Sequence, residues 1–215
     1  MKYRLIVFDW DGTIIDSAAT IAECIRESAR DMGLPVPTRE QASHVIGLGL
    51  QDSLRMAVPE LQAEHYPQFV AHYRRHFLAR EDAMGLFAGM EGLLTELGKR
   101  HLLAIATGKS RRGLERALAA TGVGPHFSAS RCADETNPKP HPAMLLELME
   151  ELGSSKDQML MIGDTSHDLE MARAAEVDSV AVTYGAHPEE GLRACNPLHC
   201  FPTVSSLSAW LKQNA

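Results

Sequence analysis

The chain has 215 residues, of which 45% are hydrophobic and 23% charged, which is typical of a globular protein with one sizeable core and room for a small second domain. Its formal net charge of −7 argues against nucleic acid and anionic membranes as partners, because neither would meet a basic face. No run of about 18 apolar residues is present, and the apolar run after Arg4 is too short for a signal peptide. We therefore expect a cytoplasmic protein in which any anionic substrate meets locally placed cations.

The first apolar run, at residues 5–8, predicts a buried strand and is followed by two acidic residues, Asp9 and Asp11. Side chains alternate along a strand, so the two carboxylates point to the same side if the extended backbone continues that far. Such a pair needs a neutralising cation, or one carboxyl must hold a proton while the other stays ionised. Gly12 permits a sharp turn directly after the pair. An ordinary Asp-Gly turn explains the pattern equally well at this point.

The next segment has the apolar spacing of helices throughout. Predicted helices cover residues 18–32, 38–45, 50–58 and 60–79. The segment contains Gly47-x-Gly49, but Asp52 stands where a dinucleotide-binding loop has its third glycine, so we interpret this stretch as a loop between helices. We predict an all-helical domain at residues 17–83, inserted into a core domain made of residues 1–16 and 84–215.

From Gly85 onward, helical and strand patterns alternate. Predicted helices cover residues 89–99, 111–121 and 143–152, and a further helix ends at residue 176. Predicted strands lie at residues 102–106, near residue 127, and at residues 159–162 and 180–182. Strands that are continuously apolar and alternate with helices indicate a parallel sheet covered on both faces. The expected fold class is therefore α/β, with a Rossmann-like parallel sheet.

The segment after residue 182 is expected to be an irregular, proline-containing tail that leads to a closing helix at residues 205–212. Within it, Cys195, His199 and Cys200 would need a fourth ligand, such as His187, to hold zinc. Their spacing is not that of a regular zinc motif, so we expect reduced thiols in this tail.

Polar residues follow the predicted strands where each strand ends. The side chains are Asp9 and Asp11, then Thr107, then Lys139 in its loop, and then Asp164 and Asp168. Ligands of parallel α/β sheets bind beyond the carboxyl ends of the strands, so we expect all of these groups at one edge. The resulting candidate site combines several carboxylates with one ammonium and one hydroxyl group.

This set of groups suits phosphoryl transfer through a covalent intermediate. Asp9 could attack phosphorus to form an aspartyl-phosphate, with Mg²⁺ held by Asp9, Asp164 and a main-chain oxygen to offset the repulsion between anions. Lys139 and Thr107 would contact the phosphoryl oxygens. Asp11 would protonate the leaving alcohol and then deprotonate the attacking water.

The four motifs Asp9-x-Asp11-Gly12-Thr13, Thr107-Gly108, Lys139-Pro140 and Gly163-Asp164-x-x-x-Asp168 resemble those of the haloacid dehalogenase-like (HAD) hydrolase superfamily. The resemblance covers essentially the whole chain, and the closest likeness is to phosphoglycolate phosphatase-like members with a helical cap after the first motif. It implies Mg²⁺ dependence, a cap at residues 17–83, a metal bond from the main-chain carbonyl of Asp11, and a role for Asp168 in orienting the metal shell or Lys139. Substrate specificity would then come from the cap loop around Gly47 and from Arg55, with Gly108 and the motif residues holding the phosphate.

Single residues separate the reactions found among such enzymes. Members that act as dehalogenases carry a non-acidic residue at the position of Asp11, and phosphonoacetaldehyde hydrolases need a cap lysine, whereas residues 17–83 contain none. The order of the motifs and the helical insertion disfavour a phosphate-accepting receiver domain. The expectation is a phosphatase, monomeric or homodimeric, for a small phosphate ester such as phosphoglycolate, a sugar phosphate or a nucleotide. A β-phosphoglucomutase-like mutase and a non-catalytic phosphate-binding relative stay open as alternatives.

Overall fold

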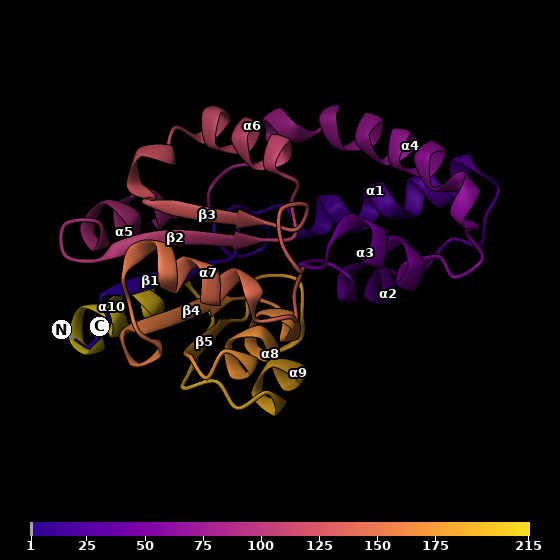
Figure 1. Cartoon of the computed structure of the whole chain (residues 1–215). Helices are drawn as coiled ribbons and strands as arrows, with labels where there is room; N and C mark the ends of the chain where they lie inside the picture. Colours follow the sequence, from indigo (N-terminus) through magenta and orange to yellow (C-terminus); the bar gives the residue numbers. More distant parts are fainter. Residues whose placement is uncertain (1) are drawn as a thin grey trace.

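A computed structural model describes residues 2–215 and contains one six-stranded parallel sheet with the strand order β3-β2-β1-β4-β5-β6. The strands are β1 (Leu5–Phe8), β2 (Leu102–Thr107), β3 (Ala129–Cys132), β4 (Met159–Gly163), β5 (Asp178–Val182) and β6 (Cys200–Phe201). Helices cover both faces of the sheet (Figure 1). This architecture confirms the predicted α/β class with a Rossmann-like sheet.

The central strand, β1, places the first motif between the second and the fourth. Phe8 pairs with Ile105 of β2 on one side and with Ile162 of β4 on the other. The chain builds the sheet outward from β1 in one direction with β2 and β3, and then in the other direction with β4, β5 and β6. The carboxyl ends of β1 and β4 therefore form the point where the strand order reverses, which is where α/β sheets bind ligands.

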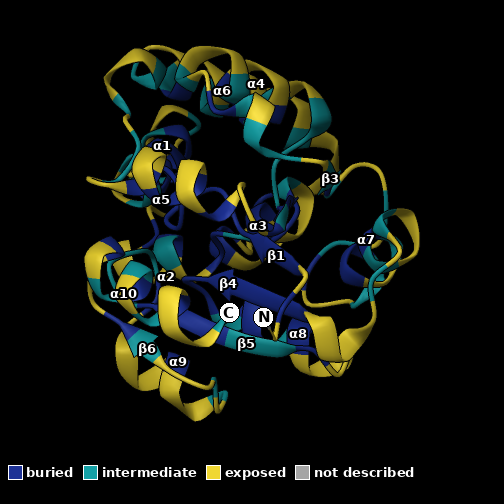
Figure 2. Ribbon diagram, turned by 90° about the vertical axis from the view of Figure 1, so that its left-hand side faces the viewer, coloured by how far each residue is buried: buried dark blue, intermediate teal, exposed yellow. Residues whose placement is uncertain are grey.

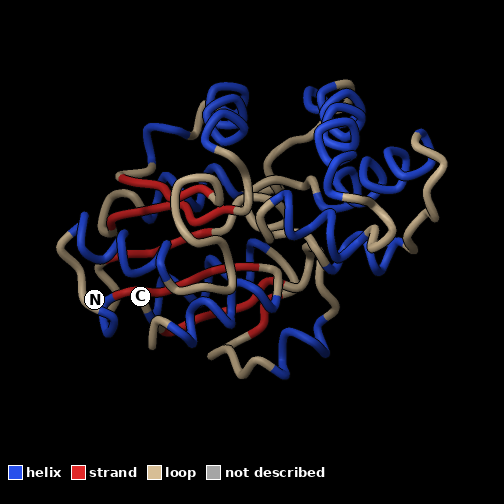
Figure 3. The backbone as a smooth tube through the Cα atoms, turned by 45° about the vertical axis from the view of Figure 1, so that its right-hand side comes forward, coloured by secondary structure: helices blue, strands red, loops and turns tan. Residues whose placement is uncertain are grey.

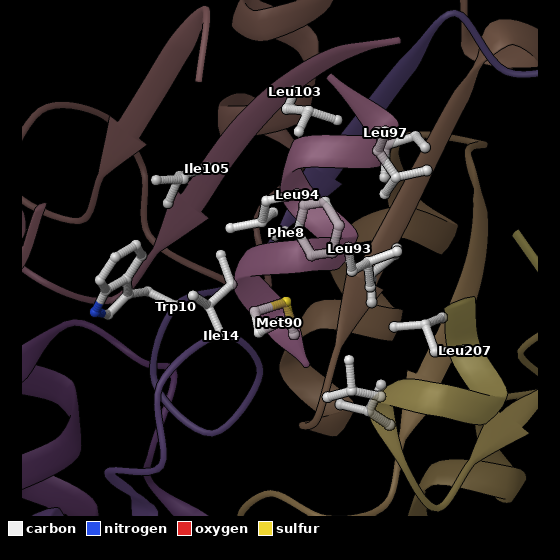
Figure 4. Packing of buried hydrophobic residues seen from close by; sticks show 14 of the residues in the cluster. Phe8, Trp10, Ile14, Met90, Leu93, Leu94, Leu97, Leu103, Ile105 and Leu207 are labelled. Carbon is white, nitrogen blue, oxygen red and sulfur yellow. The ribbon is translucent and has the colours of Figure 1, made fainter. Parts of the chain in front are cut away.

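Two apolar layers hold helices against the sheet. On one face, Phe8, Leu103 and Ile105 pack against Leu93 and Leu94 of α5 (Met90–Leu97), and Figure 4 shows these side chains interdigitated. The same layer continues to α6 (Arg111–Thr121) and α10 (Val204–Asn214). On the other face lie α7 (Ala143–Leu152) and α8 (Ser166–Ala174). The inner strands β1 and β4 are buried throughout, and the outer helix surfaces are exposed (Figure 2).

The segment at residues 17–83, hereafter the helical block, has a core of its own. It contains α1 (Ala18–Asp31), α2 (Arg39–His44), α3 (Leu50–Ala57) and α4 (Tyr66–Leu78). Ile25, Leu54 and Phe69 are fully buried together in this second core. In Figure 1 the block lies beyond the arrowheads of the strands, and Figure 3 shows its helices grouped to one side of the sheet. Its position places it over the end of the sheet where the motif residues lie.

The remaining short elements are 3₁₀ turns at Ala63–His65, Glu81–Ala83, Gly124–His126 and Lys156–Gln158. None of the helices within residues 2–215 is both long and apolar enough to cross a bilayer.

The segment after residue 182 differs from the predicted irregular tail. It contains a short helix, α9 (Glu189–Ala194), and the edge strand β6. A six-residue helix and a two-residue strand are too short for a periodic apolar pattern to reveal. Cys195 and Cys200 form no disulfide.

Several element boundaries also differ from the predicted ones. Helix α4 begins at Tyr66, six residues after the predicted start at residue 60, and Pro67 occupies its first turn, where a proline is well tolerated. Helix α8 ends at Ala174 because Glu176 has a left-handed backbone (φ 56°), which no helix can continue through. Strand β3 begins at Ala129, two positions after Phe127, and only Cys132 within it is fully buried. A half-exposed strand of small and polar residues carries little apolar signal.

Candidate active site

Three buried carboxylates meet at the carboxyl edge of the sheet. Asp9 directly follows β1, Asp164 directly follows β4, and Asp168 lies in the first turn of α8. Each offers an oxygen within 4.8 Å of oxygens of the other two. All three side chains are fully buried, so their charges are poorly solvated and demand a partner.

Lys139 supplies one positive charge to this group. Its Nζ lies 2.7 Å from Oδ1 of Asp9 and 2.6 Å from Oδ1 of Asp168, and the residue is only 2% exposed. Burial disfavours the ammonium, but the charges of Asp168 and Asp9 outweigh it and raise the pKa of Lys139. With the three carboxylates ionised, the cluster therefore keeps a charge of about −2.

The surroundings and pKa values of Asp9 and Asp164 show that the cluster has too little positive charge. Apart from the ion pair of Oδ1 with Lys139, neither oxygen of Asp9 accepts a hydrogen bond within the described chain, and burial raises the pKa of Asp9 well above its usual range despite the opposing charge of Lys139. Burial, followed by the charge of Asp168, raises the pKa of Asp164 to about 7. A divalent cation that prefers oxygen ligands would fit these residues, because it supplies the charge that Lys139 alone does not.

Hydrogen bonds orient the two carboxylates that follow β4. Thr13 donates from Oγ1 to Oδ1 of Asp164 at 2.7 Å, and the main-chain N–H of Ala186 donates to Oδ2 at 2.7 Å. Thr165 donates its hydroxyl to Oδ2 of Asp168 at 2.7 Å, within a capping box that begins α8. The capping box that begins α8 thus also fixes Asp168 in place, and the hydrogen bond from Thr13 of the first motif fixes Asp164.

Close packing at two glycines explains the Gly-containing motifs. A Cβ atom at Gly12 would overlap the carboxylate of Asp164, and Gly12 also has a left-handed backbone (φ 83°). A Cβ atom at Gly163 would overlap the side chain of Asp168. A side chain at either position would displace a carboxylate of the cluster.

Asp11 is in a separate environment from the three clustered carboxylates. Its Oδ1 accepts a hydrogen bond from Oγ of Ser17 at 2.8 Å and lies 3.1 Å from Nζ of Lys109. Asp11 lines two cavities and is 8% exposed. The side chain of Asp11 is therefore placed to exchange protons with a molecule in those cavities.

Thr107 is the last residue of β2, which pairs with β1, and Gly108 directly follows it. Oγ1 of Thr107 accepts a hydrogen bond from the main-chain N–H of Lys109 at 3.1 Å, so its hydroxyl proton is free to donate to a ligand. A Cβ atom at Gly108 would overlap the carbonyl oxygens of Gly47 and Leu48. The loop between α2 and α3 thus lies directly against the second motif.

Three histidines join the same part of the helical block to the core. Nε2 of His167 and Nε2 of His187 lie 2.9 Å and 3.0 Å from the carbonyl oxygen of His44, to which both donate. Nδ1 of His187 accepts a hydrogen bond from the main-chain N–H of Ser166 at 3.1 Å. Burial, followed by the charge of His167, lowers the pKa of His187 to about 4, so the ring is neutral. These contacts hold α2 against α8.

Two cavities lie between the helical block and the core, with volumes of about 150 Å³ and about 410 Å³. Both are lined by Asp11 and Lys109, and Gly47 and Gly108 line the larger one. Arg55, for which the sequence predicts a substrate contact, is exposed on α3 and lines neither cavity.

The structure adds site residues that the sequence analysis did not identify. They are Ser17, Lys109, Tyr73, Arg74 and Arg112. Lys109 directly follows Thr107-Gly108, so its position in the sequence was a usable signal. The residues of α4 and α6 carry no such signal, because only the packing of the block on the core brings them to the cavity.

Comparisons with known proteins agree with this geometry. The family model for haloacid dehalogenase-like hydrolase matches residues 6–182. The chain is 32% identical over 209 residues to "Probable phosphatase IndB" of Dickeya dadantii, which covers 94% of this chain and 91% of the relative. It is 29% identical over 222 residues to a phosphoglycolate phosphatase of Colwellia psychrerythraea, with coverage of 98% and 97%. The crystal structure of a hydrolase from Pseudomonas syringae has the same fold, with a TM-score of 0.90, 21% identity and 100% coverage of both chains.

Proposed function

Because the chain belongs to the haloacid dehalogenase-like hydrolase family, we propose that it is a Mg²⁺-dependent phosphatase that hydrolyses phosphate monoesters through an aspartyl-phosphate on Asp9. The observation that carries this proposal is the buried carboxylate of Asp9, which within residues 2–215 has no polar partner apart from its ion pair with Lys139 and lies beside Asp164 and Asp168. A carboxylate with free lone pairs at such a site is available as a nucleophile.

The metal would be held by Asp9 and Asp164, with the main-chain carbonyl of Asp11 and with Asp168 in the same group. When bound, Mg²⁺ supplies positive charge that offsets the repulsion between the carboxylates and a phosphoryl group. Thr13 and Ala186 orient Asp164 for this role through their hydrogen bonds. Hydrogen bonds from neighbouring residues fix the orientation of a side chain that binds a metal.

In the first step, a carboxylate oxygen of Asp9 bonds to phosphorus while the bond from phosphorus to the leaving oxygen breaks. Asp11 transfers a proton to that oxygen, so the product leaves as an alcohol. Lys139 and the hydroxyl of Thr107 bind the phosphoryl oxygens and stabilise their charge. The products of this step are the alcohol and the aspartyl-phosphate.

In the second step, Asp11 takes a proton from a water molecule whose oxygen bonds to the same phosphorus. The bond between phosphorus and the Asp9 oxygen breaks, which releases inorganic phosphate and restores the carboxylate. The helical block, as a cap domain at residues 17–83, would exclude bulk water from the site during the first step.

The test measures release of p-nitrophenol from p-nitrophenyl phosphate with Mg²⁺, with excess EDTA, and for Asp9→Asn. We expect turnover that requires the metal and is lost in Asp9→Asn. Asp157→Asn, a matched change at an exposed residue outside both cavities, should behave as wild type. A folded protein with no metal-dependent turnover, or an Asp9→Asn variant that stays active, would contradict the proposal.

A further inference from the structure

The larger cavity, of about 410 Å³, lies where the helical block meets the core. On the core side it is lined by Asp11, Gly108 and Lys109. On the side of the block, its lining is mostly apolar and includes Ile21, Ile25, Ile46, Leu48 and Phe77. Because Asp11 is the proposed proton donor to the leaving oxygen, the alcohol part of the substrate would occupy this cavity.

The volume of the larger cavity indicates how large the alcohol part of the substrate is. This volume lies within the range of about 300–1,000 Å³ that is usual for sites of drug-sized ligands. A two-carbon alcohol such as glycolate would leave most of the space to water and would contact few of the apolar side chains. An alcohol with an apolar body would instead remove those side chains from water, which contributes to binding.

Basic side chains form part of the lining of the cavity. Arg74 of α4 and Arg112 of α6 line it, and within residues 2–215 neither forms an ion pair. Asp11 is the only carboxylate among the lining residues, and it is paired with Lys109. Two free guanidinium groups in a chain of net charge −7 form a local site for a carboxylate or phosphate, which arginine binds through two parallel hydrogen bonds.

Tyr73 adds a polar contact between these two regions. Its half-buried side chain lines the cavity, and its hydroxyl forms no hydrogen bond with another residue of the described chain. Burial raises the pKa of Tyr73 well above its usual range, so the hydroxyl keeps its proton and can donate it in a hydrogen bond.

We propose that the preferred substrates are phosphate monoesters of an alcohol that has an apolar, ring-sized body and a second anionic group at its far end. This inference rests on the proposed phosphatase function. The phosphoryl group lies at Asp9, the apolar body lies against α1 and α4, and the second anionic group is bound by Arg74 and Arg112.

The test compares kcat/KM for benzyl phosphate, 4-carboxybenzyl phosphate and phosphoglycolate. The two benzyl esters release alcohols of similar acidity, so the ratio between them reports recognition of the carboxylate. We expect kcat/KM for 4-carboxybenzyl phosphate to exceed both others by about tenfold, the size of one hydrogen bond to a charged group.

The double variant Arg74→Gln with Arg112→Gln should reduce the ratio between the two benzyl esters toward one. Arg39→Gln, at an exposed arginine of α2 that lines neither cavity, should keep the wild-type ratio. Hydrolysis of both benzyl esters at equal kcat/KM, or a clear preference for phosphoglycolate, would overturn this inference and leave the phosphatase proposal standing. If the protein hydrolyses none of the three esters, both this inference and the phosphatase proposal are wrong.

Discussion

A single residue, Asp164, makes metal binding depend on pH, because its pKa is raised. Burial and the charge of Asp168 raise this pKa to about 7 in the metal-free protein. The carboxyl therefore holds a proton below pH 7, and a metal ion must displace that proton to bind the oxygen. The same group affects folding, because the folded chain binds a proton over a pH range in which the unfolded chain does not.

We expect the protonation of Asp164 to make the apparent affinity for Mg²⁺ rise by up to about tenfold per pH unit below pH 7. The folded pKa lies above the unfolded value of 3.8. The metal-free protein should therefore lose stability as the pH rises from about 4 to about 7. Titration calorimetry and thermal unfolding, each at a series of pH values, measure the two effects.

Asp164→Asn provides the control for both effects. The variant has no carboxyl to titrate, so the metal-free protein should be more stable than wild type at pH 8, and added Mg²⁺ should raise its Tm less. A Mg²⁺ affinity of wild type that does not change between pH 5 and pH 7 would show that Asp164 does not bind the metal.

At the scale of elements, the contact between the helical block and β2 depends on a glycine. A Cβ atom at Gly108 would overlap the carbonyl oxygens of Gly47 and Leu48. Backbone atoms cannot rotate away as a side chain does, so an added methyl group must move the whole loop between α2 and α3. The histidine contacts at the carbonyl of His44 resist that movement.

Gly108→Ala should therefore lower kcat/KM for phosphate esters by about tenfold or more, because a displacement of about 1 Å near the reacting groups has effects of this size or greater. It should also destabilise the protein by about 1–3 kcal/mol, as added atoms do in close-packed regions. Steady-state kinetics and urea unfolding measure the two changes.

Gly92→Ala is the matched control, because a Cβ atom at Gly92 of α5 would have no neighbour within 4 Å. It should raise stability by about 0.5–1 kcal/mol through helix propensity, with unchanged kinetics. Wild-type kinetics in Gly108→Ala would mean that the loop does not need to lie against the second motif.

In the molecule as a whole, two chain segments that lie side by side connect the helical block to the core. Ile15 pairs with Leu86 in an antiparallel bridge, and the main-chain N–H of Asp16 donates to the carbonyl of Gly85 at 2.9 Å. The block and the sheet also have separate apolar cores. A short linker can therefore close the gap that removal of the block would leave.

We expect a variant in which a short Gly/Ser linker replaces residues 17–83 to fold with the parallel sheet intact, because neither core layer of the sheet draws on the block. It should keep a metal-dependent rise in Tm, since Asp9, Asp164 and Asp168 lie outside the block. It should also lose discrimination between phosphate esters. Circular dichroism and thermal unfolding with and without Mg²⁺ are the measurements, and an unfolded variant would contradict the division at residues 17–83.

Much of the fold and of the candidate site could be predicted from local patterns. Apolar runs that end in polar residues identified the inner strands, and parallel topology then required Asp9, Thr107 and Asp164 to meet at one edge. Elements without a repeated pattern were missed or shifted, such as β6 and the start of β3, because few of their residues are buried. The rest of the site depends on contacts that no local pattern encodes.

The α/β class, the family resemblance and the carboxylate, lysine and threonine groups follow from local patterns, because the motifs come after strands whose apolar runs are visible along the chain. The pairing of Lys109 with Asp11, the contacts of His44 with two core histidines and the shared cavity of Arg74 and Arg112 come from tertiary packing. The physical reason is that these contacts join the block to the core. Their geometry depends on how two separately folded apolar cores pack together, which the spacing of residues along the chain does not specify.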